Sequence, residues 1–157
     1  MLGVLAPLRL DELGWGAGLI GVVFALAAAL QAAVNALIGR LTDMRGIRAP
    51  LRAGLSLSAA TSALLLLDNH ALVYGAIVIA AATAYATLWT PALAQLSGVI
   101  ERRGFDQAVV FGLMSAAWPP GFAIGAAAGG ALAAATTDAL PYLLSAMACL
   151  ITLRLAR

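Results

Sequence analysis

The sequence has little charge and no lysine. Only 10% of its 157 residues are charged, against roughly 25% in soluble domains, and all nine basic residues are arginines. Hydrophobic residues make up 63% of the chain, and the mean hydropathy is +0.99. This composition excludes an ordinary soluble domain and indicates an integral membrane protein with membrane lipid as its surroundings.

Residues that bind metals or carry out catalysis are also scarce. Cysteine and histidine occur once each, as Cys149 and His70, so neither a disulfide nor a zinc site is expected. No nucleotide-binding loop, catalytic triad or intramembrane cluster of acids and bases is visible, so we expect no cofactor and no enzyme. The net charge is +2, but no basic stripe with interleaved aromatics accompanies it, so no nucleic-acid partner is expected.

Long apolar runs are what the sequence does have. They last for about 20 residues, as a helical span requires, and they do not alternate as barrel strands do. Residues 1–7 look like the end of a helix whose beginning is absent. We therefore expect an all-α membrane bundle forming one domain, 1–157, with that remnant and five full spans at about 17–38, 53–67, 71–100, 108–135 and 140–153.

Prolines fall inside two of the predicted spans. Pro91 lies within the third, which predicts a tilt or a kink. Pro119 and Pro120 lie near the middle of the fourth and remove two backbone donors. We expect the fourth helix to bend or open there unless neighbouring groups satisfy the freed carbonyls.

The arginines are divided unequally between the two ends of the predicted spans. Arg9 falls at one end, and eight fall at the other, at positions 40, 45, 48, 52, 102, 103, 154 and 157. Arginine-rich loops of membrane proteins face the cytoplasm. We expect a protein of the bacterial plasma (inner) membrane with its carboxy terminus in the cytoplasm.

The densest group of charges is segment 39–52, which separates two runs without any charge, 17–38 and 53–67. Six of its residues follow a regular pattern: Gly39, Leu41, Asp43, Gly46, Arg48 and Leu51. The pattern resembles the signature loop of the major facilitator superfamily, G-x-L-a-D-R-x-G-R-K-x-x-L, which joins the second and third helices of each six-helix half. Met44 and Ile47 replace two expected basic residues.

The resemblance implies that the charges of this segment form a latch that opens and closes during transport. Asp43 would meet an arginine or a helix N-terminus in one state and lose that contact in the other. The alternative is that the arginines act only as topology signals.

A glycine pattern in the fourth span carries a second resemblance. Its residues are Gly121, Gly125, Gly129 and Gly130. They resemble the G-x-x-x-G-P-x-x-G-G element in the fifth helix of many exporters of the same family, although Ala126 stands where that element has proline. The first three glycines share one helix face, which favours close helix packing, and a substrate-linked role is the alternative.

Polar side chains within the spans are the candidates for a substrate path. Gln31 and Asn35 are four residues apart and therefore share a helix face. Trp89 and Trp118 are further candidates, from a wider set that includes Tyr85, Thr87, Thr90, Gln95 and Ser115. Each of these residue types also serves structural roles in membrane helices, by bonding the backbone or by lying at the membrane interface.

Together the two patterns imply a secondary transporter of small molecules that works by alternating access of two helical bundles. The chain is expected to be the carboxy-terminal half, beginning within its first helix and inactive without the missing amino-terminal half. Because every acid maps to a loop or a span end, a proton carrier would lie in that other half. The glycine element points to export, and Ala126 in place of its proline weakens that implication. The alternative is a membrane scaffold or assembly subunit that transports nothing.

Overall fold

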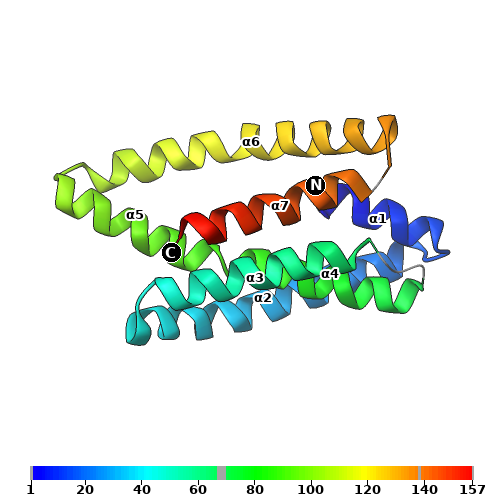
Figure 1. Ribbon diagram of the computed structural model, residues 1–157, viewed down its shortest axis with the longest axis horizontal. Helices are drawn as coiled ribbons and strands as arrows, with labels where there is room; N and C mark the ends of the chain where they lie inside the picture. Colours follow the sequence, from blue (N-terminus) through cyan, green and yellow to red (C-terminus); the bar gives the residue numbers. More distant parts are fainter. Residues whose placement is uncertain (1, 67–69, 138, 157) are drawn as a thin grey trace.

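The computed structural model describes residues 2–66, 70–137 and 139–156 (Figure 1). The regular structure in these residues is entirely helical. The elements are α1 (Leu2–Glu12), α2 (Ala17–Arg45), α3 (Arg48–Leu64), α4 (Ala71–Ala86), α5 (Trp89–Arg103), α6 (Gln107–Ala135) and α7 (Ala139–Leu155). The all-α prediction is confirmed.

Three helical segments are long and apolar enough to cross a membrane: Ala17–Arg45, Ala71–Arg103 and Gln107–Ala135. The second of these is α4 and α5 taken together. Counted in this way, the seven described helices form six helical units. Helix α7 is a shorter apolar helix. Helix α3 has 17 residues and includes Arg48 and Arg52. The described chain therefore contains three clearly membrane-length spans and a shorter apolar one, consistent with part of the predicted bundle.

Segment 39–52 was expected to be a loop, but most of it is helical. Helix α2 continues through Arg45, and α3 begins at Arg48, so only Gly46 and Ile47 separate the two helices. Gly46 has φ 76° and ψ 173°, and its positive φ is accessible to glycine but strained for other residues. Arg40 and Asp43 therefore lie on the last turns of α2, and the true link is a sharp glycine turn.

The first helix also runs further than predicted. It extends beyond residue 7 to Glu12, and Arg9 Nη1 lies 2.8 Å from Glu12 Oε2. Residues three apart are neighbours on a helix surface, so this ion pair fits the continued helix. A turn follows only at Leu13 and Gly14.

The two proline sites have different outcomes. Where a tilt or a kink was expected near Pro91, the helix is broken: α4 ends at Ala86 and α5 starts at Trp89, which leaves Pro91 in a first turn, where proline is tolerated. The opening predicted at Pro119 and Pro120 is not found, since α6 is unbroken there. Helix α6 thus continues through both prolines, although each of them removes a backbone donor.

Packing is concentrated around α3 and α4. Helix α3 lies against α7 and α4, and α2 lies against α4. A core of Leu10, Tyr74, Val78 and Tyr142 joins α1, α4 and α7. At Gly54 a Cβ atom would lie 2.7 Å from both Leu88 Cδ2 and Thr87 Oγ1, so glycine lets α3 approach the α4–α5 break closely.

The charged ends of the helices lie as their alternating directions require. The connections α2–α3 and α5–α6 are at one end of the molecule, and the α1–α2 connection is at the other (Figure 1). The first end carries Arg40, Arg45, Arg48, Arg52, Arg102 and Arg103. Arg9 lies close to the second end, which matches the predicted division, while Asp68, Asn69, Asp138 and Arg157 lie outside the described residues.

Candidate functional site

A cavity of about 310 Å³ lies where five helices converge. The described lining residues are Leu2 and Gly3 from α1, Ser62 from α3 with Leu65 just after it, Tyr85 from α4, Trp118 and Phe122 from α6, and Tyr142 and Ser145 from α7. None of these side chains is charged. The volume is at the lower end of the range for small-molecule sites, about 300–1,000 Å³. The cavity is therefore large enough for a small ligand.

Hydroxyl groups from three helices meet on the wall of this cavity. The oxygens of Ser62 and Tyr85 lie 2.8 Å apart, and either hydroxyl can be the donor. The Tyr85 hydroxyl also interacts with the side chains of Ser145 and Cys149, which are one turn apart on α7. Ser145 Oγ donates in addition to the carbonyl oxygen of Pro141 at 3.1 Å. Tyr85 thus links α3, α4 and α7 through one phenol group.

A second tyrosine connects the cavity to the packed core. The hydroxyls of Tyr142 and Tyr74 lie 3.2 Å apart, and these side chains are only 5% and 2% exposed. Tyr142 is both a lining residue and a core residue. A side chain held in this way has little freedom to move, so this part of the wall is rigid.

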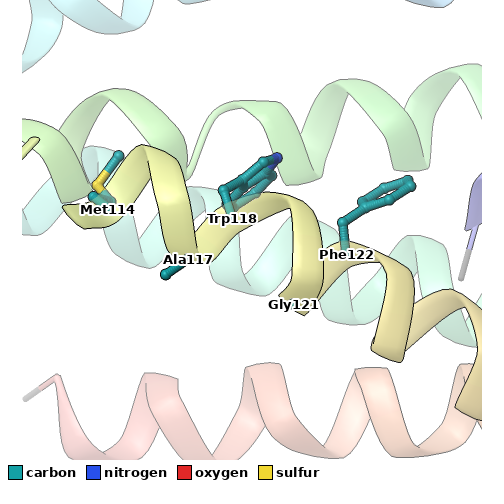
Figure 2. Close-up of a pocket in the computed structure, with 5 residues that line it drawn as sticks. All are labelled: Met114, Ala117, Trp118, Gly121 and Phe122. Atoms are coloured by element: carbon teal, nitrogen blue, oxygen red, sulfur yellow. The ribbon is translucent and has the colours of Figure 1, made fainter. Parts of the chain in front are cut away.

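The aromatic part of the lining comes from α6. Trp118 and Phe122 are four residues apart, and both project from the same side of the helix (Figure 2). The ring of Trp118 meets that of Trp89 on α5 edge to face, with centroids 4.6 Å apart and an interplanar angle of 71°. Aromatic pairs favour this geometry. Trp89 itself is not a lining residue, so it positions Trp118.

The other two predicted path residues lie elsewhere. Gln31 and Asn35 are both partly buried on α2 and do not line the cavity. Asn35 Oδ1 is buried and has no hydrogen-bond partner in the part of the chain that the structure describes. Of the four candidates, Trp89 and Trp118 are in contact, and only Trp118 reaches the cavity.

The glycine strip of α6 is uncovered along most of its length. A Cβ atom at Gly121, Gly125 or Gly130 would meet nothing within 4 Å, whereas Gly129 is buried. A hollow of about 370 Å³ next to Gly121 is lined by α6 residues alone: Met114, Ala117, Trp118, Gly121 and Phe122 (Figure 2). The described chain therefore provides no partner helix for this face, and close packing there stays a prediction.

The signature residues of segment 39–52 are mostly at the surface. Asp43, Gly46 and Arg48 are exposed, and Gly39 and Leu41 are partly exposed. Leu51 is also partly exposed and packs against the small core of Leu55, Ala59 and Cys149. Within residues 2–66, 70–137 and 139–156, Asp43 forms no ion pair. The latch contact is therefore absent from this arrangement, and its role stays a prediction.

The sequence alone did not indicate Ser62, Tyr142 and Ser145 as site residues. Hydroxyl side chains in helices commonly bond their own backbone, as Thr61 Oγ1 does with the carbonyl oxygen of Leu57 at 2.9 Å. Nothing in the sequence distinguishes Thr61 from Ser62, yet only Ser62 reaches the cavity. The spacing of Ser145 and Cys149 shows a shared face but not the helix that it meets.

The chain was also compared with known proteins. The family model of the Major Facilitator Superfamily matches residues 1–156. Comparison with curated proteins and with solved structures gives no significant match. The family match thus covers nearly the whole chain, including all five helices that line the cavity.

Proposed function

The chain belongs to the Major Facilitator Superfamily, a family of secondary transporters, and on that premise we propose that its cavity forms part of the path of a small-molecule substrate. Family and apolar helices together make it an integral membrane protein, and its relatives are transporters and not enzymes. The observation that carries the proposal is the uncharged, hydroxyl-bearing cavity between α1, α3, α4, α6 and α7. In lipid, polar groups that converge in this way mark functional sites.

We further propose that the bundle works with a second bundle that packs on α6. The open glycine positions 121 and 125 support this, because small residues allow the close backbone approach on which helix association in membranes depends. The substituted signature, with Met44 and Ile47, favours the carboxy-terminal half for this chain. The amino-terminal half would then supply the rest of the path, and this bundle would be inactive without it.

Two features support alternating access. The helical segment Ala71–Arg103 is broken between Ala86 and Trp89, so α5 can pivot on α4. Asp43 is exposed beside the sharp turn at Gly46, where a second bundle could provide its partner. Opening and closing this contact would bias one of two packing arrangements, which is how the signature segment would act as a latch.

Orientation, direction and coupling are part of the same proposal. The arginine-rich end would face the cytoplasm of a bacterial plasma membrane, and the glycine element of α6 favours export. The described acids, Asp11, Glu12, Asp43, Glu101 and Asp106, lie near helix ends or in connections. If transport is proton-driven, the carrier would therefore be in the second bundle.

Native membrane vesicles provide the test, because they contain any second bundle that the chain needs. Flux of a panel of labelled small molecules is compared between vesicles with and without the chain, and then in Trp118→Ala and Ser115→Ala variants. Trp118 lines the cavity, whereas Ser115 is exposed on α6 and does not line it. We expect flux of at least one compound to need the chain, to fall in Trp118→Ala and to persist in Ser115→Ala.

The second candidate function is a membrane scaffold or assembly subunit. The uncovered face of α6 is the observation that favours it, because such a face could bind a partner without any transport. Equal flux of every compound in the presence and absence of the chain would support the scaffold and reject the transporter.

A further inference from the structure

We propose that the cavity selects small uncharged molecules that combine a flat apolar ring with one or two hydrogen-bonding groups. The proposal rests on the function proposed above, in which this cavity is part of the substrate path. It is drawn from three properties of the lining: the absence of charge, the aromatic side chains and the position of the hydroxyl groups.

The lining disfavours ions of either sign. Among the described residues, the lining contains no carboxylate to pair with a cation, and no arginine or histidine to pair with an anion. An ionised group that leaves water for such surroundings loses its hydration without gaining a counter-charge. Ring faces of Trp118 or Phe122 could attract a cation, but a single cation–π contact recovers only a small part of that loss. A neutral ligand avoids the loss altogether.

The aromatic lining favours a flat ring of limited size. Trp118 and Phe122 present their rings from one side of α6, and Tyr85 and Tyr142 contribute rings from α4 and α7. Aromatic ligands gain from offset or edge contacts with such side chains. A volume of about 310 Å³ suits a ligand of one ring or two fused rings.

The hydroxyl groups provide the hydrogen bonds. In the pair formed by Ser62 and Tyr85, one hydroxyl donates to the other, and each hydroxyl oxygen has two lone pairs, so the pair keeps acceptor capacity. Ser145 Oγ donates to the carbonyl of Pro141 and adds a third hydroxyl oxygen to the same wall. A ligand hydroxyl or amide N–H can therefore donate to this wall, whereas a purely apolar ligand gains no such bond.

Three probes with the same ring and different charge test the proposal: naphthol, naphthoate and naphthyl-trimethylammonium. Binding to the purified chain in lipid nanodiscs is measured by equilibrium dialysis, and binding to protein-free nanodiscs is subtracted. We expect naphthol to bind at least about tenfold more tightly than either charged probe. Tyr85→Phe and Ser62→Ala should each weaken naphthol binding several-fold.

Ser56→Ala is the matched control, because Ser56 lies on the same helix as Ser62 but is exposed and outside the cavity. It should leave binding unchanged. Ser145→Ala gives an independent reading, since it keeps the bond between Ser62 and Tyr85. Helix content and elution volume confirm that each variant folds.

The proposal is overturned if a charged probe binds as tightly as naphthol, or if no cavity substitution alters binding. Failure of the proposed function looks different: selective naphthol binding would persist, while native vesicles with and without the chain would show equal flux. Chain-dependent flux without selective binding would reject only the substrate class.

Discussion

Helices α3 and α6 differ in burial, and the difference is the opposite of what their hydropathy alone would predict. Helix α3 carries two arginines and several hydroxyl residues, yet Gly54, Leu55, Ser58, Thr61 and Ser62 are all buried. Helix α6 has 29 residues and is more apolar, but only Gly129 and Ala133 are buried. In water the more apolar helix would be expected at the centre of the fold. In this protein it lies at the edge, beside the rest of the bundle (Figure 1).

The physical reason is that lipid is as apolar as leucine, so burying apolar side chains does not drive membrane helices together. Small residues favour helix association because they let the backbones approach closely. Hydroxyl groups favour it because they find hydrogen-bond partners on other helices. Helix α3 has both on one face, with Gly54 against the α4–α5 break and Ser62 bonded to Tyr85. Helix α6 has the small residues, but a Cβ at Gly121, Gly125 or Gly130 would meet nothing within 4 Å.

The largest effect on stability is expected from adding a methyl group at Gly54. Its Cβ would lie 2.7 Å from side-chain atoms of Leu88 and Thr87, so these side chains must leave their rotamers or the helices must move apart, at a cost of about 1–3 kcal/mol. Gly121→Ala is the matched control, since a Cβ there meets nothing within 4 Å. Denaturant titration of both variants in detergent measures the difference.

Gly121→Ala should cause no loss of stability in the isolated chain, because alanine is the better helix former. Equal destabilisation of the two variants would contradict the contrast between α3 and α6. Gly121→Ala could also weaken flux in native vesicles while the isolated chain stays stable. The difference between α3 and α6 would then be one of partner, because the second bundle would need this glycine.

A smaller effect is expected at the hydroxyl that joins α3 to α4. Tyr85→Phe keeps the ring and removes the bond to Ser62, which should cost about 1 kcal/mol or slightly less, as is usual for hydrogen bonds between membrane helices. The same titration measures it. If Ser62→Ala and Tyr85→Phe together cost as much as the sum of the two separate changes, the two hydroxyls do not stabilise each other.

The sequence predicted where the helices lie in the chain better than it predicted which helices pack against one another. Apolar runs bounded by charged residues placed the described spans to within a few residues, except where α1 and α2 continue past their expected ends and where α3 begins at Arg48 and not at about 53. The ends of α1 and α2 were missed because the apolar runs stop before Arg9 and Arg40, whereas arginine and glutamate are also good helix formers, so both helices continue into charged residues.

The site was only partly predictable. Trp118 was identified because a polar aromatic residue within a span is unusual, and it lines the cavity. Gln31 and Asn35 were chosen by the same reasoning, yet they face a different part of the bundle. Which face of a helix meets which neighbour depends on crossing angles and on contacts such as that of Gly54, and no local pattern encodes these.

The contact that holds α6 to α5 should have a still smaller energy. Trp89 and Trp118 are 40% and 56% exposed, so their edge-to-face pair should be near the lower limit for aromatic pairs, about 0.5 kcal/mol. A double-mutant cycle with Trp89→Leu and Trp118→Leu measures the coupling directly. Zero coupling would mean that α6 keeps its position without this pair.

The smallest effect on stability is expected at Asp43, where the effect on function should be large. Asp43 is exposed and, in the described part of the chain, forms no ion pair, so Asp43→Asn should leave the free energy of unfolding unchanged within about 0.5 kcal/mol. If the carboxylate meets a partner on a second bundle in one transport state, its loss shifts the balance between the two states and slows cycling. Flux in native vesicles measures this, with Asp11→Asn as the control, because Asp11 is equally exposed but lies near the opposite end of the bundle. Flux that falls in Asp43→Asn alone, with normal insertion, would show that an uncovered residue acts through a contact outside this bundle. Unchanged flux would remove Asp43 from the mechanism and leave the arginines around it as topology signals.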